Sequence, residues 1–228
     1  MARFYSLKKR DQDDDKIADP FGVLREIQQK VNENEKEKQT INIHNMAKAY
    51  EFLANGFEDI EALAPVDILR RGGIEIKTVS IGDSLMVESA HGVQIKADMM
   101  FSEANLADAD LLLIPGGMPG AKNIDEHEGV RQALLKQAEQ NKLIGAICAG
   151  PMVLGHLGLL QGRKATCYPG FEGELDGAEY TAAKFTIDGN IITGKGPGAT
   201  FDYAYALLTL LKGERVVREM KKGMMYND

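Results

Sequence analysis

The sequence predicts an α/β fold in which an open, mostly parallel β-sheet is covered by helices on both faces. Two observations lead to this prediction. From residue 46 onward, short apolar segments alternate with amphipathic segments of helical period, as in repeated strand–helix units. Residues 111–114 are all apolar, as expected for a central strand that is buried on both faces.

The predicted elements follow in order along residues 46–228. Glycines at positions 72 and 73 end the first predicted helix, and Glu51 is an unexpected charge within the first predicted strand. Strands are expected over residues 49–54, 74–81, 110–114, 143–147 and 165–168, with hairpins over residues 85–95 and 185–193. Helices are expected over residues 59–71, 128–141, 149–160, 199–211 and 214–222.

Residues 1–45 differ in composition from this α/β region. They carry mixed blocks of charge, and Asp19-Pro20 reads as the start of a helix with an apolar stripe at Phe21, Leu24, Ile27 and Val31. We therefore expect a charged, partly disordered N-terminal extension with one short amphipathic helix, followed by one domain over residues 46–228. The extension could dock on that domain or on a partner. Alternatively, translation starts naturally at Met46.

Bulk composition excludes several classes of function. A net charge of −7 argues against a nucleic-acid-binding surface and disfavours anionic membranes. Apolar runs stay shorter than the roughly 20 residues of a membrane span, and the N-terminus lacks the apolar core of a signal peptide. With two cysteines, the chain has no disulfide framework, which indicates a reducing, cytoplasmic location.

Cys148 lies in the layout of a nucleophile elbow, a tight turn between a strand and a helix. The positions two residues before and after it are Ala146 and Gly150, both small, and Pro151 suits the first turn of the following helix. Backbone N–H groups at the start of that helix would favour a thiolate. The alternative is a cysteine that only fills the core at the end of a strand.

Two further loops are expected to meet this turn at the carboxyl edge of the sheet. Residues 115–120 are rich in glycine and can offer backbone N–H groups to a developing oxyanion. Residues 56–61 contain three carboxylates. A desolvated carboxyl there would stay partly protonated and could exchange protons with the thiol. Alternatively, these acids only complement the dipole of the helix.

Other candidate motifs carry less chemistry. None of the four histidines has metal-ligand spacing to another histidine or to a cysteine, so no metal site is expected. His91 is a candidate lip residue, His127 is expected to be solvated, and Cys167 is expected in the core on a strand. Residues 194–198 lack the Gly-Lys-Ser/Thr of a P-loop, and no dinucleotide-binding glycine motif follows the first strand.

Taken together, these motifs identify a family resemblance. Residues 56–61 (GFEDIE), 115–117 (PGG) and 146–151 (AICAGP) occur in the order typical of the ThiJ/PfpI superfamily. The chain most resembles the branch that contains the Parkinsonism-associated protein deglycase and the bacterial ThiJ/YajL-like proteins. The resemblance covers residues 46–211, and residues 194–198 (GKGPG) also fit it.

The resemblance implies a flavodoxin-like, class I glutamine amidotransferase-like three-layer sandwich that forms a homodimer and needs no cofactor. It implies that Cys148 is the nucleophile and Glu61 its protonated partner, with Glu58 as a second acid nearby. It also implies that the N–H groups of Gly117 and Ala149 form the oxyanion pocket. Activities attributed to this branch include glyoxalase, protein deglycase, chaperone action and the sensing of oxidative stress.

Two positions depart from the family patterns. Protease-like members have histidine directly after the elbow cysteine, where this chain has Ala149, which disfavours a Cys–His peptidase. The human-type branch has a histidine near the cysteine where this chain has Tyr168, a hydrogen-bond donor but a poor base. Glu61 is therefore left as the main candidate for proton transfer.

These residues suggest an enzyme that acts on small α-oxoaldehydes or early glycation adducts through a hemithioacetal on Cys148. One alternative is a redox-sensing or chaperone-like stress protein whose Cys148 oxidises to a sulfinate. A weaker alternative is a thiol-dependent amidase or peptidase.

Overall fold

A computed structural model describes residues 46–226 of the protein. The charged extension and the helix expected within residues 1–45 lie outside the described residues, so the role of that segment stays a prediction.

The described residues form an α/β structure around a seven-stranded sheet of order β10-β11-β7-β6-β1-β2-β5. Every pairing in it is parallel except that of β10 with β11. The strands are β1 (Lys48–Leu53), β2 (Glu75–Ser80), β5 (Met99–Met100), β6 (Leu111–Ile114), β7 (Leu143–Ile147), β10 (Phe185–Asp188) and β11 (Ile191–Gly194). The predicted fold class is therefore confirmed.

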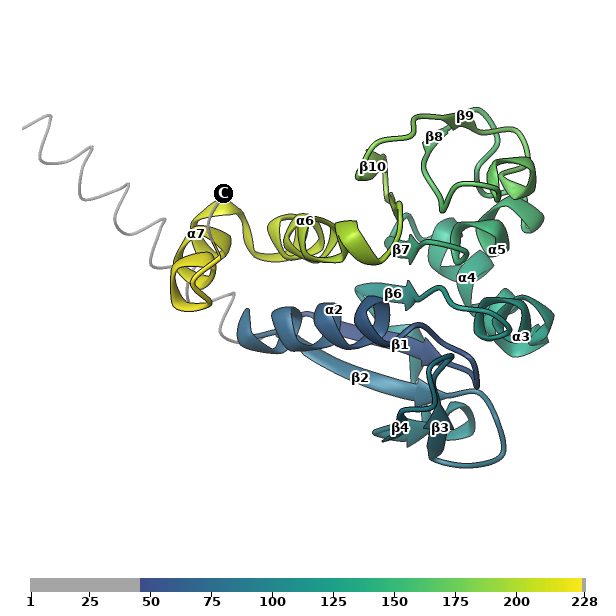
Figure 1. Ribbon diagram of the computed structural model, residues 1–228, viewed down its shortest axis with the longest axis horizontal. Helices are drawn as coiled ribbons and strands as arrows, with labels where there is room; N and C mark the ends of the chain where they lie inside the picture. The colour runs from purple at the N-terminus through teal and green to yellow at the C-terminus, as the bar shows by residue number, and fades with distance from the viewer. Residues whose placement is uncertain (1–45, 227–228) are drawn as a thin grey trace, which may run out of the picture. The chain divides into compact units, whose positions relative to one another are not determined.

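Helices cover both faces of this sheet (Figure 1). They are α2 (Asp59–Arg71), α3 (Gly120–Glu126), α4 (Glu128–Glu139), α5 (Pro151–His156), α6 (Thr200–Lys212) and α7 (Glu214–Gly223). Helix α2 packs against α6, and α6 packs against α7. Helix α3 packs against both α4 and α5.

Successive residues of the central strands feed two hydrophobic clusters, one on each face of the sheet. Ala49 and Leu113 belong to the cluster that contains residues of α2 and α6. Tyr50 and Leu112 belong to the cluster that contains residues of α3, α4 and α5. This alternation is what a pleated strand buried on both faces requires.

Short elements decorate the sheet. The predicted hairpin between residues 85 and 95 is present as β3 (Met86–Glu88) paired antiparallel with β4 (Gln94–Lys96). A second small pair, β8 (Lys164–Ala165) with β9 (Glu179–Tyr180), is parallel. Four single-turn 3₁₀ segments are η1 (Phe101–Glu103), η2 (Leu106–Asp108), η3 (Glu172–Glu174) and η4 (Pro197–Ala199).

The structure corrects two predicted elements near the cysteine. The helix expected over residues 149–160 is limited to α5, because Gly158 has a φ of +70° and the Leu159 N–H donates to the Leu154 carbonyl, which closes the helix. The strand expected over residues 165–168 stops at Ala165. Beyond it, the Thr166 N–H donates to the Thr193 hydroxyl instead of continuing a β-ladder.

Within residues 46–226, no helix combines the length and the apolar character that crossing a lipid bilayer would require.

Candidate active site

The predicted turn between a strand and a helix is present at Cys148. The residue directly follows β7, and its φ of +64° is unusual for a side chain other than glycine. Its N–H donates to the Gly194 carbonyl at 2.9 Å. At Gly150, a Cβ would come within 2.8 Å of the Ile114 carbonyl oxygen, so the tight path of the chain requires a glycine there. This strained corner holds the thiol at the carboxyl edge of the sheet.

Glu61 of α2 lies against the thiol. Its side chain is fully buried, and its Oε2 atom accepts a hydrogen bond from the Gly116 N–H at 3.0 Å. This carboxyl group also lies close enough to the Cys148 side chain for hydrogen bonding with the thiol to influence its pKa. Burial, aided by the charge of Glu58, raises the pKa of Glu61 from 4.5 to about 7, although the bonds from Cys148 and Gly116 oppose this shift.

The Cys148 thiol is itself a weak acid in this environment. Burial is the main cause of a raised pKa, and the neighbouring Glu61 carboxylate adds to it. The backbone N–H groups of Ala149 and Gly117 act in the opposite direction on the pKa. These N–H groups thus favour a thiolate, as expected, but desolvation and the charge of Glu61 outweigh them.

The two acids behave as a coupled pair. When Glu61 is ionised, its negative charge disfavours a thiolate beside it. When Glu61 holds the proton, that repulsion disappears and the carboxyl can donate a hydrogen bond to the sulfur. Near neutral pH the pair can therefore hold a single proton, either on the sulfur of Cys148 or on the carboxyl of Glu61. When the carboxyl holds it, the sulfur is a thiolate and can react.

Glu61 makes the stability of the protein depend on pH. Its pKa of about 7 in the folded protein lies above the ordinary value of 4.5, so the folded state binds this proton more tightly than the unfolded chain. The stabilisation is complete below the ordinary pKa and is lost as the pH rises through about 7. We expect the free energy of unfolding of the wild type, relative to Glu61→Gln, to fall by about 3 kcal/mol across this window.

Urea denaturation of both proteins at several pH values measures this difference. A difference that stays constant across the window would contradict a proton held on buried Glu61.

Glu58 and the 115–120 loop fix the position of Glu61. The Glu58 carboxylate caps α2 by accepting a hydrogen bond from the Glu61 N–H at 2.7 Å. The Glu58 N–H in turn donates to the Gly116 carbonyl at 3.0 Å. At Gly117, whose φ is +86°, a Cβ would collide with the backbone of Phe57 and Glu58. Residues 56–61 and 115–120 are thus held together by backbone contacts that leave no room for larger residues.

Gly116 lies between the side chains of Glu61 and Cys148, and the space there is too small for any larger residue. A Cβ on this residue would lie 2.5 Å from Glu61 Oε2 and 2.6 Å from Cys148 Cβ. We expect Gly116→Ala to lower the free energy of unfolding by about 1–3 kcal/mol, because one of the two side chains must move. Urea denaturation measures the loss. Gly82→Ala is the matched control, since a Cβ there meets nothing within 4 Å; equal stabilities of the two variants would contradict this packing.

Tyr168 borders a cavity beside the pair. Its N–H donates to the Cys148 carbonyl at 2.9 Å, while its side chain is exposed. Gly196 lies next to the Tyr168 ring, and a Cβ at Gly196 would be 3.8 Å from Glu61 Oε1. The cavity has a volume of about 340 Å³, and its lining consists of Tyr168, Pro169, Lys184, Lys195, Gly196, Pro197, Gly198 and Ala199. A small substrate could approach the pair from this side.

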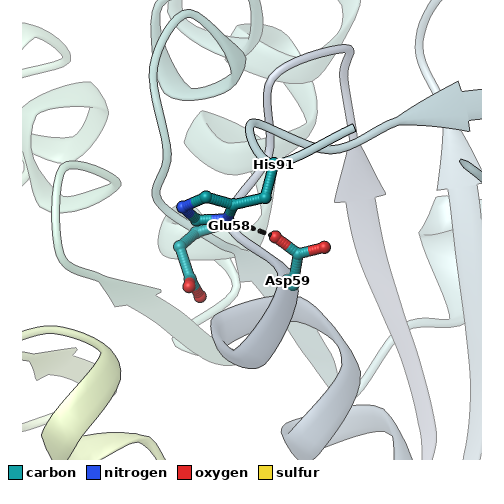
Figure 2. A group of neighbouring side chains, drawn as sticks. All are labelled: Glu58, Asp59 and His91. Atoms are coloured by element: carbon teal, nitrogen blue, oxygen red, sulfur yellow. Dashed lines mark hydrogen bonds and ion pairs between the residues drawn. The ribbon is translucent and has the colours of Figure 1, made fainter. Parts of the chain in front are cut away.

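His91 lies on the turn between β3 and β4, near the start of α2 (Figure 2). Its Nδ1 is 2.6 Å from Asp59 Oδ2, and this hydrogen bond raises the pKa of the exposed imidazole. Figure 2 shows the imidazole above Glu58 and bonded to Asp59. One potential metal-ligand atom from each of Glu58, Asp59 and His91 lies within 4.8 Å of the others. The sequence did not reveal this group, because 32 residues separate His91 from Asp59.

The two other histidines within residues 46–226 and Cys167 have structural roles. His127 is half-buried and caps α4 by accepting a hydrogen bond from the Val130 N–H, so the prediction that it is solvated is wrong. His156 bridges Asp125 and Glu174. Cys167 is fully buried, as expected of a core residue, but it lies beyond the end of β8. Burial raises the pKa of its thiol to about 11.

Comparison with known proteins places this site in a family context. The model of the DJ-1/PfpI family matches residues 47–210. The Parkinson disease protein 7 homolog of Danio rerio is 34% identical over 185 residues, which cover 79% of this chain and 98% of that protein. A deglycase of Pyrococcus horikoshii is 30% identical over 161 residues, which cover 70% of this chain and 96% of that protein.

Not all relatives have the same length. Protein DJ-1 homolog B of Arabidopsis thaliana is 35% identical over 174 residues, and the match covers 76% of this chain. This chain spans only 40% of that relative, so the match concerns part of a longer protein.

Solved structures have the same fold. A cysteine-to-alanine mutant of a DJ-1 superfamily protein from Salmonella typhimurium has a TM-score of 0.77 and 35% identity, covering 80% of this chain and 100% of its own. Oxidized DJ-1 from Toxoplasma gondii also has a TM-score of 0.77, with 33% identity and the same two coverages.

Proposed function

The chain belongs to the DJ-1/PfpI family, and from this premise we propose that it is a cofactor-independent cysteine enzyme of the glyoxalase or deglycase type. Its substrates would be small α-oxoaldehydes, such as methylglyoxal and glyoxal, or early glycation adducts. The observation that carries the proposal is the buried Cys148–Glu61 pair, in which the thiol lies beside a carboxyl whose pKa is raised to about 7.

The first step suits this pair. The Cys148 thiolate adds to the aldehyde carbon, and a C–S bond forms as the carbonyl electrons move to oxygen. The N–H groups of Ala149 and Gly117, which already act on the sulfur, would hold this oxygen while its negative charge develops. Protonated Glu61 then gives its proton to the oxygen, which yields a neutral hemithioacetal and an ionised carboxylate.

The second step needs a base that can return its proton. Ionised Glu61 removes the proton from the former aldehyde carbon and passes it to the ketone oxygen, which gives an enediol. Glu61 then takes the proton of the hydroxyl on the sulfur-bearing carbon and delivers it to the adjacent carbon, so that the thioester carbonyl forms. The product is a thioester of a 2-hydroxyacid on Cys148. One water hydrolyses the thioester and restores the thiol, so methylglyoxal and water become lactate without any redox cofactor.

The surroundings support a small substrate. The cavity beside Tyr168, with a volume of about 340 Å³, has room for a small aldehyde. Desolvation at the pair favours reaction with an aldehyde carbon, which needs no acid to expel a leaving group. Ala149 stands where a histidine base would follow the cysteine, so an amide leaving group would lack a proton donor of that kind. The Pyrococcus horikoshii relative is itself named a deglycase.

A second candidate function follows from the same donors. A sulfinate on Cys148 would accept hydrogen bonds from the Ala149 and Gly117 N–H groups and from protonated Glu61. Two peroxide molecules would supply its two oxygens and leave as water. Mild peroxide treatment followed by mass spectrometry tests this reading: two added oxygens are expected on Cys148, and equal oxidation of Cys167 would oppose a tuned site.

Lactate formation from methylglyoxal without glutathione tests the proposed enzyme. We expect the purified full-length chain to form lactate well above the rate of the buffer. Rates no greater than those of the buffer, for lactate from methylglyoxal and for glycolate from glyoxal alike, would overturn the proposal.

A further inference from the structure

Two further buried polar side chains, those of Glu51 and Tyr203, lie in the core near Glu61. Five buried side-chain atoms have no hydrogen-bond partner among the described residues, and three of them belong to these residues, namely Glu51 Oε2, Tyr203 Oη and Glu61 Oε1. All three residues are at most 1% exposed. Buried polar atoms are normally paired, so unpaired atoms on neighbouring residues indicate a shared network.

Backbone positions place these residues on the same face of the sheet. Glu51 of β1 is in register with Leu113 of β6, and Leu113 is in register with Gly145 of β7. The Tyr203 hydroxyl of α6 occupies the space above Gly145, where a Cβ would collide with it. Glu51 and Tyr203 are therefore brought together across β6, on the face covered by α2 and α6.

Electrostatic interactions join the same residues. The charge of Glu61 acts on Glu51, and the charges of both carboxyls act on Tyr203. The titratable groups that act on Glu61 are Cys148 and Glu58. Burial first, and then the charge of Glu61, raises the pKa of Glu51 well above its ordinary value, which favours the protonated form of this carboxyl.

The donors and acceptors of these three residues can be paired in one order, from Glu51 through Tyr203 to Glu61. A protonated Glu51 offers an O–H donor, Tyr203 can both accept and donate, and ionised Glu61 can only accept. Donation from Glu51 to Tyr203 and from Tyr203 to Glu61 Oε1 would satisfy all three atoms. Glu61 Oε2 is already used by the Gly116 N–H. If Glu51 were ionised instead, two carboxylates would compete for one hydroxyl.

We propose that Glu51, Tyr203 and Glu61 form one hydrogen-bonded network, completed by internal water, in which Glu51 and Tyr203 are positioning residues for Glu61. Buried water commonly links polar groups that cannot reach one another directly. The network stabilises the ionised form of Glu61 through Oε1, the carboxyl oxygen that the Gly116 N–H does not bond. It thereby sets the pH at which the Glu61–Cys148 pair loses its first proton.

The network has a measurable consequence for Glu61. Removing a donor leaves the buried carboxylate less stable, so its pKa must rise. One lost hydrogen bond to a charged group corresponds to an upward shift of about one pH unit. Carbon-13 NMR of the full-length protein with labelled glutamate carboxyls follows this shift, and loss of a resonance in Glu61→Gln and in Glu51→Gln assigns the two groups.

We expect the midpoint of Glu61 to rise by about one pH unit in Tyr203→Phe and in Glu51→Leu. Glu51→Gln keeps a donor at the same place, so its Glu61 midpoint should stay near that of the wild type. The Glu51 carboxyl should remain protonated through neutral pH. Tyr50→Phe is the matched control, because Tyr50 precedes Glu51 on β1, belongs to the cluster on the opposite face, and bonds to Asp108.

Two results would overturn the network. One is an unchanged Glu61 midpoint in Tyr203→Phe, a substitution that removes a single oxygen and tests the proposal even if a Glu51 variant does not fold. The other is a Glu51 carboxyl that titrates with the exposed glutamates. The inference deepens the site of the proposed function, but the titration needs no turnover. The titration can therefore show the network in a protein that makes no lactate, and it can exclude the network in a protein that does make lactate.

Discussion

Cys148→Ala is expected to lower lactate formation from methylglyoxal by roughly 10³-fold or more, to the rate of the buffer. The reason is that the hemithioacetal needs the sulfur at the end of β7, and alanine offers no nucleophile in its place. Initial rates of lactate release, at methylglyoxal concentrations that define kcat/KM, measure the loss.

Cys167→Ala is the matched control for this substitution. Cys167 is fully buried and belongs to the hydrophobic cluster on one face of the sheet, whereas Cys148 belongs to the cluster on the other face. We expect it to retain the rate of the wild type, with some loss of stability from the smaller side chain in the core. A Cys148→Ala protein that keeps the wild-type rate, or a Cys167→Ala protein that loses it while folded, would contradict the assignment of the nucleophile.

Glu61→Gln is expected to lower kcat/KM for methylglyoxal by roughly 10²- to 10⁴-fold. Glutamine keeps the size of the side chain but can neither remove a proton from carbon nor return one. The same assay measures the effect. In heavy water, the wild type should form lactate with deuterium at the carbon that receives the proton, because a proton held on Glu61 exchanges with solvent.

Glu58→Gln controls for the loss of a nearby negative charge. Glu58 caps α2 but does not bond to the Cys148 side chain, so we expect a change of less than about tenfold together with a slightly less stable helix. If Glu61→Gln were as active as Glu58→Gln, Glu61 could not be the group that transfers the proton.

The sequence was sufficient to predict the fold, because its signals are local. Four apolar residues at 111–114 and the two glycines after α2 specify a buried strand and a helix end without reference to the rest of the chain. Hairpins at residues 86–96 and 185–194 follow from similar local patterns. Where the strand predicted over residues 165–168 was wrong, a tertiary contact decided the outcome: the Thr166 N–H donates to the hydroxyl of Thr193, 27 residues further along the chain.

The site was predicted in part, and the limits have a physical cause. The small residues around Cys148 and the acids of α2 are signals of short range, and the structure brings Cys148, Glu61, Gly117 and Ala149 together. The raised pKa of the thiol was missed because it depends on burial and on a carboxylate 87 positions earlier in the chain, which no local pattern reports.

Glu51 is a second residue whose role depends on partners that are distant in the sequence. Within the first strand it stood out only as a charge in the wrong place. Its meaning depends on Tyr203, which comes from the last third of the chain, and on the bare backbone at Gly145, which makes room for the tyrosine hydroxyl. Partners this far apart in sequence are recognised only once the sheet and its covering helices are in place.

The central claim is that the substrate becomes covalently attached to Cys148 and rearranges there with the help of Glu61. Rapid acid quenching during the first turnover with methylglyoxal, followed by peptide mass spectrometry, tests it most directly, since a thioester survives acid. We predict a lactoyl thioester on the peptide that contains Cys148, and its absence in Glu61→Gln. Lactate formed at the wild-type rate while Cys148 remains a free thiol, or an acyl group on Cys167 instead, would contradict the claim.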